Sequence, residues 1–165
     1  MADLRLTHIP VAKAELLVRK PVAEVFEAFV NPTLTRNFWF THGSGRLEVG
    51  NQIQWDWEMY GVSTQINVKK LERDQLILVE WGGSEGKTSL EFTFTPRADN
   101  TTFVSVTESG FNGDGDKVTE LAMDSAAGFM LVLAGLKAYI EHGIELNLIS
   151  DRFPDLLVKH RGQTT

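Results

Sequence analysis

Few residues in this sequence have the type and spacing for acid–base chemistry, and Glu108 is the foremost of them. It follows Val104 and Val106 at two-residue intervals in an alternating stretch, so its carboxylate is expected to point inward if that phase holds. A carboxylate buried without a partner is costly, so it would need a hydrogen-bond donor or water. Arg36 or Tyr139 could donate. A frayed strand end that leaves Glu108 in solvent is the simpler interpretation.

The histidines lack the spacing of metal ligands, so no metal site is predicted: His8, His42, His142 and His160. Only His42, beside an aromatic string and a glycine loop, is a candidate to contact a ligand; otherwise it is a surface histidine. Asp56 and Glu58 lie two residues apart on one face of a predicted strand, but neighbouring glutamines mark that face as solvated. We therefore predict no catalytic residue and no cofactor.

Three strings imitate known ligand-binding loops, and each lacks a required residue. In the string 82–88, Gly86 and Lys87 resemble the end of a phosphate loop, but the position that needs the first glycine is Trp81, directly before the string. An alternating strand follows instead of the helix that such a loop requires. The string 43–45 has a glutamate where the dinucleotide fingerprint needs its third glycine. The string 112–116 is followed by a lysine where a calcium loop needs glycine. The first is predicted as a hairpin loop and the second as a loop. The third is predicted as a polar loop that caps the long helix, with Asp116 as the cap.

Aromatic residues give a stronger signal than titratable ones. Trp55, Trp57 and Met59 share one face of a predicted strand, and Phe92 and Phe94 share one face of another. The strand 76–81 is apolar on both faces, and we expect its inward residues to be Ile77, Val79 and Trp81. These rings predict a lining for the interior of a curved sheet.

Small residues are expected opposite these rings, on the first half of a long helix: Ala122, Ser125, Ala126, Ala127 and Gly128. A glycine inside a helix costs about 1 kcal/mol relative to alanine, which indicates a packing or functional need. Small residues facing a concave sheet leave volume, and an apolar cavity with few polar groups is typical of small-molecule sites. Rings that fill the gap completely are the alternative. The predicted ligand contacts are Trp39, Trp55, Trp57, Met59, Trp81, Phe92, Glu108, Phe111, Ala122, Ser125 and Phe129.

The elements that must position these residues follow from the hydrophobic periodicity. The expected order is a strand ending near 20, a helix over 21–30, a short helix over 33–39, strands over 52–59, 62–71, 76–81, 90–95 and 101–109, and a long helix over 118–140. Gly143 suggests the end of that helix, with an extension through Leu148 as the alternative. The short connections predict an antiparallel meander, and the segregated helices predict an α+β fold.

Composition narrows the function classes. The chain has 165 residues, no cysteine, and a net charge of −6 from 16 basic and 22 acidic residues. An acidic protein gains little from counterion release at phosphates, so nucleic acid is not expected as the main partner. Disulfides, thiolate metal sites and cysteine nucleophiles are excluded. The longest apolar run, 126–136, is too short to span a bilayer, and we expect a soluble cytoplasmic protein with no membrane span.

Several strings resemble the heat-shock-protein-90 ATPase activator homologue family of the START-like (SRPBCC, Bet v-like) helix-grip superfamily. They are the segments 21–26 (PVAEVF), 38–40 (FWF), 107–111 (TESGF) and 128–143, which includes LAGLK and ends in EHG. The resemblance covers about 11–154 and implies a curved antiparallel sheet wrapped around a long C-terminal helix, with two short helices after the first strand. It implies one START-like domain over 1–165, with a core of about 11–154 and a short polar C-terminal tail.

Three functions follow as hypotheses. The first is binding of a small hydrophobic or aromatic ligand, such as a lipid or polyketide, between sheet and long helix. The second is a cyclase- or hydrolase-like enzyme, since similar folds include such enzymes on aromatic or polyketide-like substrates; Glu108 or His42 would then be the acid–base group. The third is a co-chaperone-like interaction module, with a chaperone or a second copy as partner. Because no convergent catalytic constellation is present, binding without catalysis is favoured.

Overall fold

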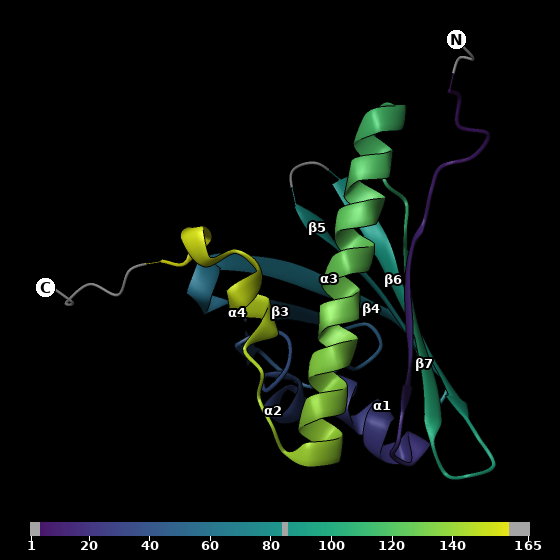
Figure 1. Ribbon diagram of the computed structural model, residues 1–165, viewed down its shortest axis with the longest axis vertical. Coiled ribbons are helices and arrows are strands. Elements are labelled where there is room, and N and C mark those ends of the chain that lie inside the picture. Colours follow the sequence, from purple (N-terminus) through teal and green to yellow (C-terminus); the bar gives the residue numbers. More distant parts are fainter. Residues whose placement is uncertain (1–3, 84–85, 159–165) are drawn as a thin grey trace, which may run out of the picture.

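A seven-stranded antiparallel sheet is the scaffold of the computed structural model, which describes residues 4–83 and 86–158 (Figure 1). The strand order is β1-β7-β6-β5-β4-β3-β2. The strands are β1 (Ala12–Val18), β2 (His42–Gly43), β3 (Gln52–Trp57), β4 (Val62–Glu72), β5 (Leu76–Gly83), β6 (Gly86–Pro96) and β7 (Thr102–Ser109). The predicted antiparallel meander is confirmed; the two-residue strand β2 was expected as part of a loop.

The helices are α1 (Val22–Val30), α2 (Pro32–Thr35), α3 (Gly115–His142) and α4 (Leu148–Arg152), with short 3-10 turns at η1 (Glu58–Tyr60) and η2 (Pro154–Leu156). In Figure 1, α3 lies lengthwise across the sheet, and α1 and α2 lie near its C-terminal end. This arrangement is the α+β helix-grip architecture expected from the sequence.

The second short helix ends at Thr35, earlier than the predicted Trp39. The Thr35 hydroxyl donates to the carbonyl of Ala28 at 2.6 Å and that of Asn31 at 3.0 Å. Beyond it, the three consecutive rings of 38–40 are all buried. A regular helix turns successive side chains about 100° apart, so irregular backbone is needed to bury all three.

The two ends of α3 are fixed by caps. The carboxylate of Asp114 accepts a hydrogen bond from the Lys117 N–H at 2.9 Å, so Asp114 is the cap and the prediction of Asp116 was wrong. An N-cap side chain reaches the N–H three residues ahead, whereas Asp116 already lies in the first turn. At the other end Gly143 adopts φ 67°, a left-handed conformation that ends the helix rather than extending it through Leu148.

The inner face of the sheet carries the core, with buried residues alternating along the strands except at the irregularity of β4 between Val68 and Lys70. Strand β3 buries Ile53, Trp55 and Trp57, and β5 buries Ile77 and Val79 as predicted. The alternation of β3 stops at Trp57 because the turn η1 follows, so Met59 does not share the strand face as predicted. The same turn removes Glu58 from the strand face that it was expected to share with Asp56.

The segment after α3 packs back onto the protein, whereas the polar tail predicted beyond 154 lies mostly outside the described residues, which end at 158. After Gly143 the chain turns back, and α4 lies beside α3 in Figure 1. Among the described residues, α3 is the one helix long and apolar enough to cross a membrane by length and composition. It buries Phe129, Leu133 and Leu136 against the rest of the protein, which makes it the core helix of the fold.

Candidate functional site

A pocket of about 670 Å³ lies between the inner face of the sheet and α3, with α4 and η2 on a further side. Seven predicted ligand contacts line it: Trp39, Trp57, Trp81, Glu108, Phe111, Ser125 and Phe129. Of the five small residues expected on the helix side, Ser125 and Gly128 line the pocket, and the Arg152 guanidinium covers the backbone of Gly128. The other three do not line it: Ala122 and Ala126 belong to a separate core cluster, and Ala127 is exposed. The interior at this place is therefore hollow, and its wall is mostly apolar.

Glu108 points into the interior and is only 6% exposed, so the inward phase given by the alternation holds, and the simpler interpretation of a frayed strand end in solvent was wrong. Its Oε1 accepts hydrogen bonds from Trp81 Nε1 at 3.0 Å and from the Thr88 hydroxyl at 2.6 Å. Its Oε2 accepts a short hydrogen bond from the Ser125 hydroxyl on α3. Three neutral donors from three elements thus hold the carboxylate in place.

The register of the sheet explains how these donors meet. Trp81 on β5 lies opposite Thr88 on β6, and Leu90 lies opposite Glu108 on β7. Since Thr88 and Leu90 are two residues apart, they share the inner face, and Thr88 is the diagonal neighbour of Glu108. The proposed partners Arg36 and Tyr139 were wrong. Tyr139 instead packs against another ring near the C-terminal end of α3.

Trp39 occupies the centre of the aromatic wall. Its ring centroid lies 4.8 Å from that of Trp55, 5.6 Å from that of Phe129 and 6.0 Å from that of Trp81. These tilted and edge-on pairs are the arrangements that aromatic side chains prefer. The irregular backbone after α2 thus places a ring between the sheet and the long helix.

Two predicted contacts lie behind this wall. Trp55 is 2% exposed and Phe92 is 1% exposed, and both are covered by the ring of Trp39, so neither lines the pocket. Periodicity gives the face of a strand but not the depth of a residue below it, which is why both were predicted as contacts.

Two further predicted contacts lie elsewhere. Ala122 packs against Phe111 and Val118 in a separate small core cluster, beyond the pocket lining. Met59, displaced by the turn after β3, lines a different hollow of about 150 Å³ between the segment 36–41, which follows α2, and the segment 145–150. The structure brings together seven of the eleven predicted contacts and leaves these four outside.

The C-terminal segment contributes a wall of the pocket that was not predicted from the sequence. The residues it adds to the pocket are Ile149, Arg152, Phe153 and Leu156. Arg152 Nη2 donates to Asp124 Oδ1 at 2.8 Å and to the Asp124 carbonyl at 3.1 Å, which ties α4 to α3. Ile149, Phe153 and Leu156 recur at helical spacing, which was the available signal for this wall.

Tyr60 forms a second connection to this wall. Its hydroxyl donates a short hydrogen bond to the carbonyl of Ile149, and its ring lies 6.3 Å from that of Phe153. Farther along, the Val158 N–H donates to the Met59 carbonyl at 2.8 Å. No residue of α4 is fully buried, and Ile149 is partly buried against the main core, so these polar contacts and the packing of Ile149 and Phe153 together hold the wall against the rest of the protein.

His42 does not reach the pocket. Its Nδ1 lies 3.0 Å from Asp56 Oδ2, and its side chain is 62% exposed. Hydrogen bonds from Ser63 and Gln54, with a smaller contribution from His42, hold the pKa of the Asp56 carboxyl below its usual value. Asp56 thus belongs to a polar network at the surface, as the solvated face predicted. Within 4–83 and 86–158, no group of three His, Cys, Asp or Glu side chains could hold a metal ion.

A curved antiparallel sheet closed by a long C-terminal helix over a hollow interior defines a protein of the helix-grip class. The sequence profile described as "Activator of Hsp90 ATPase homolog 1-like protein" matches residues 19–141. The chain belongs to this family. No curated protein matches the sequence.

Solved structures agree with this assignment. The protein SSP2350 from Staphylococcus saprophyticus is 32% identical, with a TM-score of 0.72 over 83% of this chain and 96% of that one. DynU16, from the dynemicin biosynthetic locus, is 25% identical with a TM-score of 0.71, and the match covers 82% of this chain but only 48% of DynU16. The Aha1 dimer from Colwellia psychrerythraea, 20% identical, shares the fold, with a TM-score of 0.67 over 81% of this chain and 98% of that one.

Proposed function

We propose that this protein binds a small, largely apolar or aromatic molecule in the pocket between the sheet and α3. The observation that carries the proposal is the pocket itself: about 670 Å³, walled by rings, with a single buried carboxylate. Small-molecule sites typically measure about 300–1,000 Å³ and combine an apolar lining with a few placed polar groups.

The energetics favour a ligand of ring size or larger. Burying about 150 Å² of apolar ligand surface is worth about 4 kcal/mol before the entropic costs of binding. Trp57, Trp81 and Phe129 supply that contact area, and Glu108 orients the ligand through a hydrogen bond to its polar end. DynU16 belongs to a biosynthetic locus, which supports a small organic molecule rather than a polymer as the ligand.

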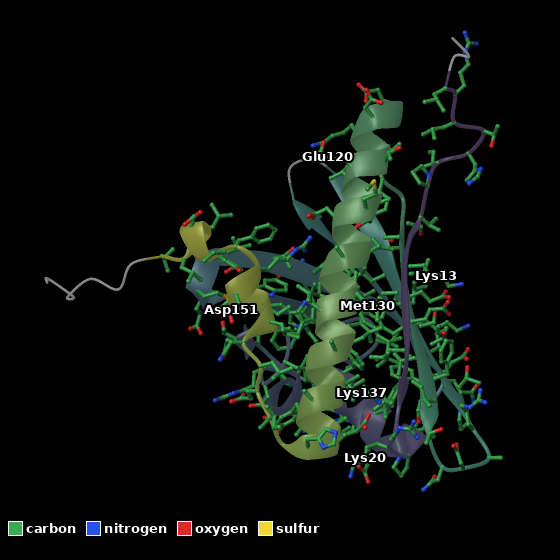
Figure 2. All side chains as sticks on the ribbon, viewed as in Figure 1. Lys13, Lys20, Glu120, Met130, Lys137 and Asp151 are labelled. Atoms are coloured by element: carbon green, nitrogen blue, oxygen red, sulfur yellow. The ribbon has the colours of Figure 1, made fainter. Side chains whose placement is uncertain are left out.

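Calorimetric titration with a library of naphthalene-sized compounds tests the proposal. We expect binding at one site per chain, with a matching rise in melting temperature. Leu121→Trp places an indole at a position that lines the pocket and should abolish binding, whereas Met130→Trp, at an exposed position of the same helix (Figure 2), should leave binding intact. Absence of both heat and thermal shift across the library would contradict the proposal.

Catalysis on an aromatic substrate is the second candidate, and the buried carboxylate is the observation that favours it. A general acid or base must lie within hydrogen-bond reach of the group it serves, and Glu108 lies at the pocket wall. His42, the other nominee, is directed to Asp56 on the surface. If a bound compound is converted, Glu108→Ala should abolish turnover; unchanged turnover would remove Glu108 from that role.

A further inference from the structure

We propose that the ligand of this pocket is a cation: an apolar, ring-bearing amine whose ammonium group is bound by Glu108. This inference rests on the proposed binding function and names the chemical class of its ligand. Three features of the pocket carry it: the partners of the carboxylate, the charge balance of the wall, and the rings beside it.

The partners of Glu108 are all neutral. Trp81, Thr88 and Ser125 donate hydrogen bonds, and within the described residues no Lys, Arg or His side chain lies within ion-pair distance of the carboxylate. A buried charge is costly unless it is paired as well as hydrogen-bonded. A carboxylate that is 94% buried with no protein cation beside it is therefore completed by a cation from the ligand.

The carboxylate also has acceptor capacity left. Two carboxylate oxygens offer about four lone-pair sites. Oε1 accepts from Trp81 and Thr88, whereas Oε2 accepts from Ser125 and from no other residue that the structure describes. Since Glu108 lines the pocket, Oε2 can accept one further hydrogen bond from a ligand N–H.

The remaining charges of the wall do not oppose a cation. The single basic side chain among the described lining residues is Arg152, and its guanidinium is paired with the Asp124 carboxylate at 2.8 Å. Glu108 and Asp124 together contribute two negative charges and Arg152 one positive charge. The wall is left with one negative charge in excess, and that excess resides on Glu108.

The rings near Glu108 suit the same ligand. The indole of Trp81 is bonded to the carboxylate, and its ring centroid lies 6.2 Å from that of Trp57 and 6.0 Å from that of Phe129. Aromatic faces attract cations within about 6 Å, tryptophan most strongly. An alkylammonium, like that of lysine, stays protonated at neutral pH. An amine at this place gains an ion pair with Glu108, and each ring face that comes within about 6 Å of the ammonium adds a cation–π contact.

Three probes with the same ring separate charge from shape: naphthylmethylamine, naphthylmethanol and naphthoate. In calorimetric titrations at neutral pH we expect the amine to bind at least about tenfold more tightly than the alcohol, and the naphthoate to bind most weakly. This comparison uses the unaltered protein. An alcohol that binds as tightly as the amine, or a tighter naphthoate, would overturn the inference while leaving the binding function standing. Binding of none of the three would overturn both.

A variant pair places the charge preference on Glu108. Glu108→Gln keeps the shape and an acceptor oxygen but removes the charge, so the amine should lose its advantage while the alcohol binds as before. Glu91→Gln removes the same charge from an exposed position of β6 and should leave the advantage unchanged. An amine preference that survives Glu108→Gln would contradict the assignment.

Discussion

The guanidinium of Arg152 lies directly against the backbone of Gly128. A β-carbon built at Gly128 would lie 2.7 Å from Arg152 Nη1, closer than such atoms approach one another. The glycine in the first half of α3 therefore leaves room for the residue that ties α4 to α3. The sequence indicated a special need at this position, and the structure gives that need as a close approach between two helices.

Gly128→Ala is expected to stabilise the protein slightly. Alanine favours a helix interior by about 1 kcal/mol over glycine, and the atom in its way is the end of a flexible side chain that can move aside. The unfolding free energy from urea denaturation should rise by up to about 1 kcal/mol. Destabilisation beyond about 1 kcal/mol would mean that the guanidinium cannot shift.

Gly135→Ala, on the same helix, should have the opposite effect. A β-carbon there would lie 3.2 Å from the carbonyl oxygen of Phe38 and 3.3 Å from its Cβ, and backbone cannot yield as a side chain does. Overpacking a core costs about 1–3 kcal/mol, more than the helix preference returns. We expect a net loss of about 1 kcal/mol in the same denaturation experiment; a gain would contradict this packing.

Arg152→Ala should loosen the C-terminal wall without unfolding the protein. The Arg152–Asp124 pair is largely at the surface, where such pairs contribute at most about 1 kcal/mol. Hydrogen exchange should nevertheless become faster at the amides of 149–156, because α4 has no fully buried residue and only the partly buried Ile149 packs against the main core. Lys70→Ala, which removes an exposed ion pair of β4, serves as the control and should leave this exchange unchanged. Equal exchange in wild type and Arg152→Ala would show that the pair does not hold the wall.

Trp81→Phe should lower the free energy of unfolding by more than the loss of ring area alone would. It removes the Nε1 donor from Glu108, and a lost hydrogen bond to a buried charged group costs about 1.5–3 kcal/mol. Trp57→Phe is the matched control, since its indole N–H donates no hydrogen bond to the described residues. The difference between their unfolding free energies should be at least about 1 kcal/mol. Equal losses would show that the donor is dispensable.

The decrease in the free energy of unfolding at low pH should depend in part on Glu141. Burial alone would raise the pKa of its carboxyl, but the hydrogen bonds from the Arg19 N–H and from Lys137, with the Lys137 charge, lower that pKa below its usual value of 4.5. A lowered pKa in the folded state stabilises the protein above the unfolded value, and the contribution is lost as the pH falls through the folded value.

Glu141→Gln is therefore expected to lower the unfolding free energy by about 1–2 kcal/mol at pH 7 and by progressively less below about pH 4.5. Thermal melts across this pH range measure the difference. Glu120→Gln, at an exposed position of the same helix (Figure 2), is the control and should follow the wild-type profile. A constant difference between Glu141→Gln and wild type at all pH values would contradict the pKa direction.

The fold could be predicted from the sequence because its signals are local and repeated. Alternation sets the inner face of each strand, so counting from Val104 gives Glu108 an inward phase, although the count alone did not exclude a frayed strand end in solvent. The partners of Glu108 could not be found in this way. Thr88 and Trp81 meet it through the register of three strands, which depends on pairing between residues distant in the sequence.

Which residues line the pocket was harder to predict than which rings face the interior. Trp55 and Trp57 have the same phase and type, yet one lies behind Trp39 and the other lines the pocket. The irregular backbone after α2 places Trp39 and so decides which ring lies behind it and which lines the pocket. No periodic signal in the sequence predicts that backbone. Arg152 reached the site through the reversal at Gly143, and a single chain-reversing residue gives no information about where the following segment will pack.

The most direct measurement is a crystal structure of the protein soaked with a bromine-labelled naphthylmethylamine, read by the anomalous signal of the bromine. We predict one peak between α3 and the sheet, beside the rings of Trp57 and Phe129, with the amine nitrogen within hydrogen-bond distance of Glu108. A space closed by collapsed side chains, or a probe bound only at the molecular surface, would contradict the hollow interior on which the account rests.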